Sequence, residues 1–145
     1  MGRRRILFLC THNSARSIMA EAIMRHMMGD AWEVHSAGTE PSGVNPMALK
    51  VLEEAGIDTH GLKSKSLEEF TGQRFDVVVT LCDSSKDACP HFSGADTHIH
   101  RPFPDPSSVA GPPEEKIEAF RKVRDEISWW LEEVFGEGKG IYSCR

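Results

Sequence analysis

The sequence predicts an α/β fold built on a four-stranded parallel sheet. Short strand-like runs alternate along the chain with helical patterns, which is the order expected of parallel sheets. Two of these runs, residues 6–9 and 75–81, are rich in apolar and β-branched residues, which is typical of strands covered on both faces. A chain of 145 residues is long enough for one such domain, so we expect a single domain over residues 1–145.

Each expected element has its own local signal. We expect strands at residues 4–9, 32–37, 75–81 and 95–100. Helical periodicity predicts helices at 17–28, 46–55 and 114–135, and Ser66 with Glu69 could form a capping box for a short helix. The residues expected to face the core from the first and last of these helices are Met19, Ala22, Ile23, His26, Met27, Ile117, Phe120, Val123, Ile127, Trp130 and Val134.

Composition narrows the class of protein. A net charge of −5 and a pI near 5.8 argue against a general nucleic-acid binder. No apolar run reaches membrane-spanning length, and the start of the chain lacks a small-residue cleavage site, so we expect no membrane association and a cytoplasmic location. We also expect a monomer.

The stretch ILFLCTHNSAR is the strongest chemical signal. It takes Cys10 from the end of a buried strand into a loop, and Ser17 begins the next helical pattern. Backbone N–H groups at a helix N-terminus lack partners, so this position binds oxyanions and favours a thiolate. Arg16 could grip the anion with its planar guanidinium. The loop residues expected to surround the anion are Thr11, His12, Asn13, Ser14, Ala15 and Ser17.

Two more reactive residues should reach the same edge of the sheet. Cys82 follows the run at 75–81, and Asp105 lies in the long loop after the last strand. In a parallel sheet the binding crevice lies beyond the carboxyl ends of the strands, so Cys10, Cys82 and Asp105 should converge there.

The four cysteines (10, 82, 89 and 144) allow more than one interpretation. In a cytoplasmic chain they indicate nucleophilic or redox chemistry more often than structural disulfides. A zinc site at Cys82, Cys89, His91, His98 and His100 is disfavoured, because the two cysteines are too far apart in sequence and no second close pair exists. We therefore expect no metal, and Cys144 is interpreted as a tail thiol without a role.

The motifs together resemble a known family. CTHNSARS, VHSAG, GVNPMA, VVVTLCDSSKDACP, the Asp-Pro at 105–106 and FRKVRDEI are similar to the thioredoxin-coupled arsenate reductases of the low-molecular-weight protein tyrosine phosphatase fold. The resemblance covers nearly the whole chain and implies a three-layer sandwich. It is the combination of C-x5-R with TLC-x6-CP and a late Asp-Pro that makes it specific.

This resemblance implies a cysteine relay. Cys10 would attack arsenate while Arg16 holds the oxygens, and Asp105 would protonate the departing oxygen. Cys82 would then attack Cys10 and release arsenite, and Cys89 would attack Cys82, leaving a Cys82–Cys89 disulfide for thioredoxin. If residues 82–89 were helical, the two cysteines would be roughly 10 Å apart, too far for a disulfide. We therefore expect segment 83–89 to unwind when it oxidises.

Several loop residues have both structural and functional interpretations. Asn13 could maintain the shape of the loop or be an ordinary turn residue, and Ser17 could donate to Cys10 or merely cap the helix. His12 is expected to face solvent and is not counted as catalytic.

Some family members bind potassium through residues matching Asn13, Glu21, Ser36 and an aspartate where this chain has Lys65. The Lys65 ammonium could replace the ion and pair with Glu21, or Lys65 could be an ordinary exposed loop residue. We expect no potassium dependence in either case.

Two other functions remain open. A low-molecular-weight phosphotyrosine phosphatase would need only Cys10, Arg16 and Asp105, but Ser107 and Ser108 stand where such phosphatases carry tyrosines. Weak phosphatase activity on small esters is still expected. A non-catalytic oxyanion or redox sensor is less favoured, because Cys10, Arg16 and Asp105 are all present.

Overall fold

The computed structural model describes residues 2–82 and 91–136. Its strands are β1 (Arg4–Cys10), β2 (Trp32–Gly38), β3 (Phe75–Thr80) and β4 (Ala95–His100). Its helices are α1 (Arg16–Met28), α2 (Pro46–Glu54), the 3-10 turns η1 (Leu67–Phe70) and η2 (Pro106–Ser108), and α3 (Pro113–Phe135). The predicted strands and the three longer helices are confirmed, with ends within one residue of those expected. The expected short helix is the 3-10 turn η1, where the Ser66 side chain accepts from Glu68 N and does not form the expected capping box with Glu69. The long loop after β4 contains η2, which was not expected.

The four strands form one parallel sheet in the order β2-β1-β3-β4. The chain passes from β1 outward to β2 and then returns to the other side of β1 to form β3. The strand order therefore reverses between β1 and β3, and this is where parallel sheets form their binding crevice. The two most apolar runs of the sequence occupy these two central strands.

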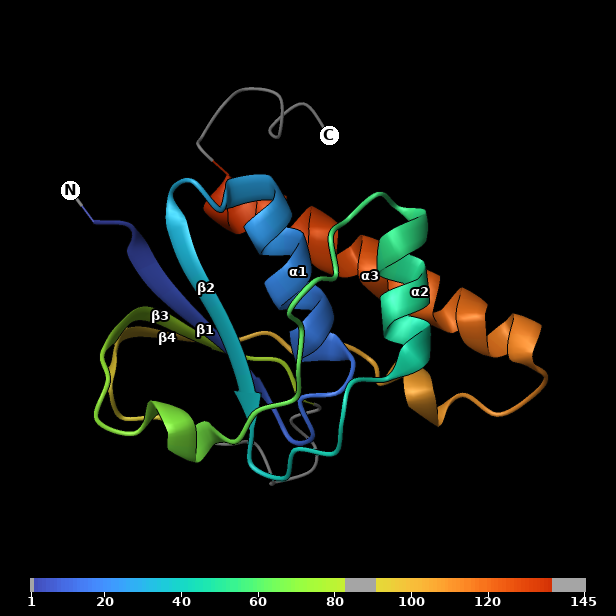
Figure 1. The fold of residues 1–145 in the computed structure, drawn as a ribbon, viewed down its shortest axis with the longest axis horizontal. Coiled ribbons are helices and arrows are strands. Elements are labelled where there is room, and N and C mark those ends of the chain that lie inside the picture. Colours follow the sequence, from blue (N-terminus) through green and yellow to red (C-terminus); the bar gives the residue numbers. More distant parts are fainter. Residues whose placement is uncertain (1, 83–90, 137–145) are drawn as a thin grey trace.

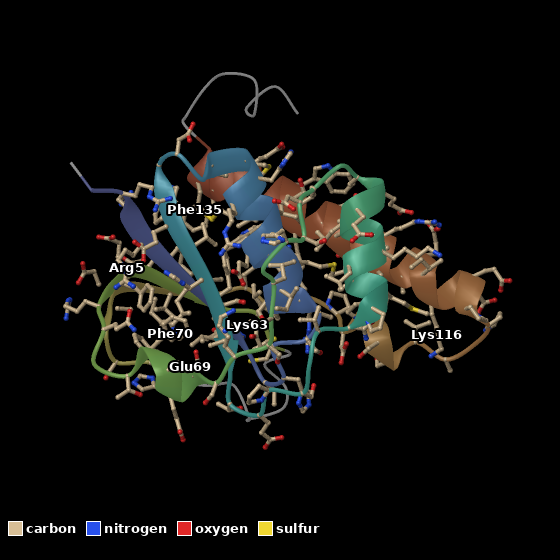
Figure 2. The ribbon with its side chains drawn as sticks, in the orientation of Figure 1. Arg5, Lys63, Glu69, Phe70, Lys116 and Phe135 are labelled. Atoms are coloured by element: carbon tan, nitrogen blue, oxygen red, sulfur yellow. The ribbon has the colours of Figure 1, made fainter. Side chains whose placement is uncertain are left out.

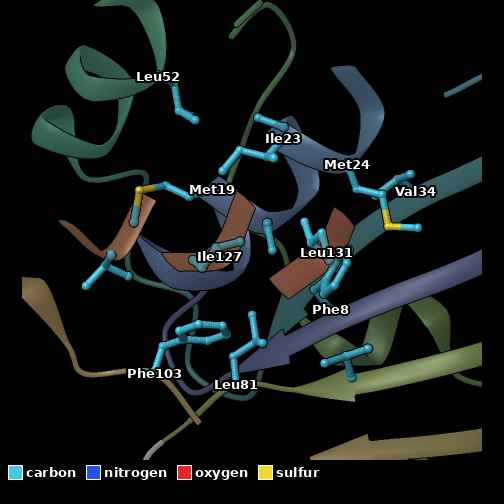
Figure 3. Close-up of a cluster of buried hydrophobic side chains, with 14 of the residues drawn as sticks. Phe8, Met19, Ile23, Met24, Val34, Leu52, Leu81, Phe103, Ile127 and Leu131 are labelled. Carbon is cyan, nitrogen blue, oxygen red and sulfur yellow. The ribbon is translucent and has the colours of Figure 1, made fainter. Parts of the chain in front are cut away.

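The main core lies between the sheet and the three α-helices, which share one side of the sheet (Figure 1). Alternate residues of β1 and β3 face these helices, and Phe8, Met19, Ile127 and Leu131 meet there (Figure 3). The other face has a thinner cover. Phe70 of η1 and Phe92 pack there against Phe75, and Figure 2 shows Phe70 on the side away from α1–α3. Together these make the three layers expected.

Two predictions of helix faces were wrong. Val134 of α3 is 44% exposed, whereas Leu131 is fully buried. Leu131 lies one turn beyond Ile127, so the buried stripe continues through it and bypasses Val134. His26 of α1 is also exposed, because Met24 and Met28 take the buried side of the last turn and His26 lies on the opposite side. The first nine residues of α1, in contrast, are buried on every side. That part of the helix therefore has no solvent-exposed face, and periodicity could not identify which of its residues are buried.

An ion-pair cluster joins α2 to α3 and gives a pH-dependent prediction. Arg121 and Arg124 contact the Glu54 carboxylate at 2.6 and 2.9 Å, and the hydrogen bond from Arg121 is the main reason that the pKa of Glu54 lies below its ordinary 4.5. A lowered pKa means that the stabilisation is present above pH 4.5 and is lost as the pH falls further. Glu54→Gln should therefore lower the Tm at pH 7 by a few degrees, and the difference from wild type should shrink below pH 4.5. Glu133→Gln is the control, since Glu133 pairs with no cation within the described ranges. A Tm difference between Glu54→Gln and wild type that stays constant at all pH values would contradict the prediction.

No helix within residues 2–82 and 91–136 is long and apolar enough to cross a membrane.

Candidate active site

The loop that follows β1 brings the predicted nucleophile to the point where the strand order reverses. Cys10 ends β1 and is only 2% exposed, and its Sγ lies 2.9 Å from Ser17 Oγ in the first turn of α1. Ala15 precedes that helix and makes no side-chain cap. The N-terminal N–H groups of α1 therefore remain available to an anion bound in the loop.

The peptide groups of the loop are oriented from outside by residues 38–45. The N–H groups of Glu40, Ser42 and Asn45 donate to the carbonyls of Thr11, His12 and Ser14 at 2.8, 3.2 and 2.9 Å. In a trans peptide the carbonyl and the following N–H point in opposite directions. Fixing these carbonyls outward therefore turns the N–H groups that follow them toward the interior of the loop. The exposed His12 ring also bonds outward, to Glu40 O at 3.1 Å, as expected for a residue that is not catalytic.

Gly38 is a site residue that the sequence reasoning missed. It pairs with Cys10 at the end of β2, and a Cβ there would lie 2.6 Å from Thr11 O and 2.9 Å from Asn13 N. The loop backbone thus packs directly on this α-carbon. The signals in the sequence were a glycine at the end of a strand, which is common and not specific, and its place in the VHSAG motif, which gives no physical role to the glycine.

Asn13 is the centre of the hydrogen bonds inside the loop. Its φ of 50° lies in the left-handed region that asparagine tolerates better than most residues. Its Oδ1 accepts from Lys65 N at 2.7 Å, and because a backbone N–H can only donate, this contact fixes the orientation of the amide. Its Nδ2 consequently donates to Ser17 Oγ at 2.7 Å and to Ser36 Oγ at 3.0 Å. A Cys10 thiolate can only accept, so in that state Ser17 donates its own proton to Cys10 Sγ.

The same network continues to a buried carboxylate. Ser36 Oγ donates to Glu21, which is 3% exposed and pairs with Arg25. Lys65 Nζ lies 3.6 Å from Glu21 Oε1, and the Lys65 side chain is only 11% exposed. Of the two interpretations of Lys65, the structure supports the cation beside Glu21 over an ordinary exposed lysine.

The position of Lys65 leads to the prediction that the protein does not depend on potassium. A cation already lies beside the Glu21 carboxylate, so an added monovalent ion has little to neutralise there. Activity and Tm should be equal in potassium and sodium chloride at the same ionic strength. A clear gain with potassium would contradict this.

Arg16 and Asp105 meet at the rim of the loop. Arg16 Nη1 donates to Phe103 O at 3.1 Å, and Nη2 lies 3.8 Å from Asp105 Oδ2. The segment that carries Asp105 is attached to the end of β3, because Phe103 N donates to Leu81 O at 3.2 Å. The structure thus brings together the predicted anion-binding arginine and the predicted acid.

Cys82 lies beside this site, two residues beyond the end of β3, and is 5% exposed. Cys89, segment 83–89 and Cys144 lie outside the described residues. Within the part of the chain that is described, no group of three or more histidine, cysteine or acidic side chains is arranged to hold a metal ion.

Comparisons with known proteins agree with this geometry. The model of the low-molecular-weight phosphotyrosine protein phosphatase family matches residues 5–137. The arsenate reductase of Halalkalibacterium halodurans is 42% identical over 139 residues, covering 96% of this chain and 100% of that protein. An arsenate reductase solved in the phosphate-binding state has a TM-score of 0.73 and 30% identity, covering 90% of this chain and 95% of that one.

A third similar protein is named as a thioredoxin-dependent enzyme. The thioredoxin-dependent arsenate reductase of Corynebacterium glutamicum has a TM-score of 0.65 and 26% identity, over 90% of this chain and 61% of that chain. The family match over most of the chain, the identity to arsenate reductases and the arrangement of Cys10, Arg16 and Asp105 agree. This chain belongs to the low-molecular-weight phosphotyrosine protein phosphatase family, on the branch whose named relatives are arsenate reductases.

Proposed function

We propose that this protein reduces arsenate to arsenite through a relay of Cys10, Cys82 and Cys89. The names of its relatives support the reaction. The observation that carries the relay is the position of two cysteines at the ends of adjacent strands. Leu81 N donates to Leu9 O at 2.9 Å, so the residue before each cysteine is hydrogen-bonded to the other strand.

This pairing supports a short distance between the two cysteines. Neighbouring strands lie about 4.8 Å apart. Leu9 pairs with Thr80, so Cys82 lies one residue past the position opposite Cys10. With residues about 3.3 Å apart along a strand, the separation of the two Cα atoms stays within the about 7 Å that a disulfide requires. The phosphatase reaction requires Cys10, Arg16 and Asp105 but no second cysteine.

The first step forms a covalent adduct. The Cys10 thiolate attacks the arsenic of arsenate, while Arg16 and the inward N–H groups of the loop hold its remaining oxygens. The arsenic–oxygen bond that breaks leaves its electron pair on the oxygen, and Asp105 supplies a proton so that water departs. Ser17, which donates to Cys10 Sγ, stabilises the thiolate before the attack.

The second step transfers the electrons. The Cys82 thiolate attacks Cys10 Sγ, and the pair from the sulfur–arsenic bond passes to arsenic, which leaves as arsenite in the +3 state. Cys89 then attacks Cys82, which frees Cys10 as a thiolate. Two thiols have become one disulfide, which balances the two electrons taken up by arsenic. Thioredoxin, a dithiol reductant, would restore the thiols.

The phosphatase alternative uses the same first step but has less support. Ser107 and Ser108 follow Asp105, and their hydroxyls bond back to Asp105 at 2.7 and 2.8 Å. They offer no aromatic surface against which a phosphotyrosine ring could pack. Weak hydrolysis of small aryl phosphates remains expected, since the loop binds any tetrahedral oxyanion of this size.

One pair of assays tests the proposal. Arsenate-dependent NADPH oxidation is measured with thioredoxin and thioredoxin reductase, and hydrolysis of p-nitrophenyl phosphate is measured separately. Cys82→Ser should lose arsenate turnover and keep the hydrolysis, whereas Cys144→Ser should keep both. A Cys82→Ser variant that still turns over arsenate at the wild-type rate would refute the relay.

A further inference from the structure

Asp105, the proposed acid, has two carboxylate oxygens in different surroundings. Oδ1 accepts two hydrogen bonds from Ser107, one from its N–H at 3.0 Å and one from its Oγ at 2.7 Å. Oδ2 lies 3.8 Å from Arg16 Nη2 and accepts no hydrogen bond from any described residue. The carboxylate is therefore held at one oxygen by Ser107 and faces the anion-binding loop with the other.

This asymmetry decides where a proton can reside. The Ser107 N–H can only donate, so the oxygen it contacts must act as an acceptor. Protonating Oδ1 would place a third hydrogen beside the two that Ser107 already directs at that oxygen. Oδ2 has no such donor and is the oxygen next to the Arg16 guanidinium, which holds the substrate.

We propose that Ser107 is a positioning residue that reserves Asp105 Oδ2 as the proton-carrying oxygen. The inference rests on the proposed function in assigning Asp105 as the acid. The Ser107 hydroxyl does not contact substrate. By occupying Oδ1 it prevents the carboxyl from rotating and keeps the proton on the side of the departing oxygen, to which Oδ2 transfers it as the bond to arsenic or phosphorus breaks.

The effect should depend on the leaving group. A poor leaving group such as phenol needs a proton as its bond breaks, whereas p-nitrophenol departs readily as an anion. We would measure kcat/KM for phenyl phosphate and for p-nitrophenyl phosphate, because kcat/KM reports the steps up to departure of the first leaving group. Arsenate reduction gives a further measurement, since its departing oxygen also needs a proton.

Ser107→Ala should lower kcat/KM for phenyl phosphate and for arsenate by about 3- to 10-fold, the effect of one hydrogen bond. The value for p-nitrophenyl phosphate should change less than twofold. Ser107→Thr keeps a hydroxyl and should restore the ratio of the two ester rates. Ser108→Ala is the matched control, because its hydroxyl bonds Asp105 O at 2.8 Å and not the carboxylate, so the ratio should stay at the wild-type value.

A double-mutant comparison connects the effect to Asp105. Asp105→Asn should lower the phenyl phosphate rate far more than Ser107→Ala, and adding Ser107→Ala to it should not change the ratio further. An equal loss on both esters in Ser107→Ala, or an unchanged ratio, would overturn the inference. An unchanged ratio in Asp105→Asn would overturn it too. If the ratio changes as expected but arsenate is not reduced, the proposed function fails and the role of Ser107 stands.

Discussion

Gly38→Ala should reduce arsenate turnover by about 100-fold, the scale of loss expected when catalytic groups are displaced by about 1 Å. The new methyl group would lie 2.6 Å from Thr11 O, 2.8 Å from Cys10 O and 2.9 Å from Asn13 N. All three are backbone atoms, which cannot rotate away as the end of a side chain could. The loop must move as a unit, and its N–H groups move with it. Steady-state kcat/KM for arsenate measures the loss.

The cost in stability should be of about the same size, since a 100-fold loss of activity corresponds to about 2.7 kcal/mol. Overpacking of a buried position typically destabilises a protein by about 1–3 kcal/mol, so the variant should still fold. Gly43→Ala is the control within the same 38–45 segment. Gly43 has a φ of +96° and no neighbour within 4 Å of a new Cβ. It should lose about 1 kcal/mol of stability through backbone strain but keep its activity within a few-fold. Wild-type kcat/KM in Gly38→Ala would show that the loop does not depend on this contact.

The contrast between Gly38 and Cys10 shows what the sequence could predict. Cys10 was predictable because an apolar strand, a cysteine and a helix start stand next to each other in the chain. Gly38 lies 28 residues away and reaches the loop only through the parallel register in which it pairs with Cys10. Register depends on the packing of β1 against β2, and no local periodicity encodes it. The contacts of Glu40, Ser42 and Asn45 with the loop carbonyls were unpredictable for the same reason.

Burial around α1 and α3 shows a second limit. Periodicity identifies one apolar face, which served well for Phe120, Val123 and Ile127 of α3 but failed for Val134, where the stripe passes through Leu131. Near the N-terminus of α1 hydrophobic periodicity gives no signal, because every residue there is buried. Glu21 and Ser17 are buried among polar partners, so their burial depends on the hydrogen bonds of Asn13 and Ser36 and not on their own hydrophobicity.

Asn13→Asp should be the most damaging isosteric change in this network. The new carboxylate can still accept from Lys65 N, but it loses both donors that Asn13 presents to Ser17 and Ser36. The hydroxyl of Ser17 would then donate to Asp at position 13 and turn away from Cys10 Sγ. A negative charge would also lie beside the reacting sulfur. We expect kcat/KM for arsenate to fall by about 100-fold, as for the loss of a preorganised donor in an active site.

One measurement and one control variant separate this explanation from simple unfolding. Alkylation of Cys10 by iodoacetamide, in a background with the other three cysteines replaced by serine, should slow about tenfold at fixed pH, because the thiolate has lost its hydrogen bond. Asn45→Asp is the matched control. Asn45 uses its Oδ1 to accept from Met47 N at 2.8 Å at the start of α2, and an aspartate caps that helix equally well. It should react and turn over at the wild-type rate.

The direction of donation is the feature that this experiment tests. Lys65 N fixes the Asn13 amide, the amide fixes the two serine hydroxyls, and Ser17 has only one proton to give. Each hydrogen bond therefore sets the direction of the next one, from the Lys65 N–H to the Cys10 sulfur. If Asn13→Asp alkylates as fast as wild type, Ser17 does not depend on Asn13 for its orientation, and the thiolate must be stabilised by the loop N–H groups and the α1 N-terminus alone.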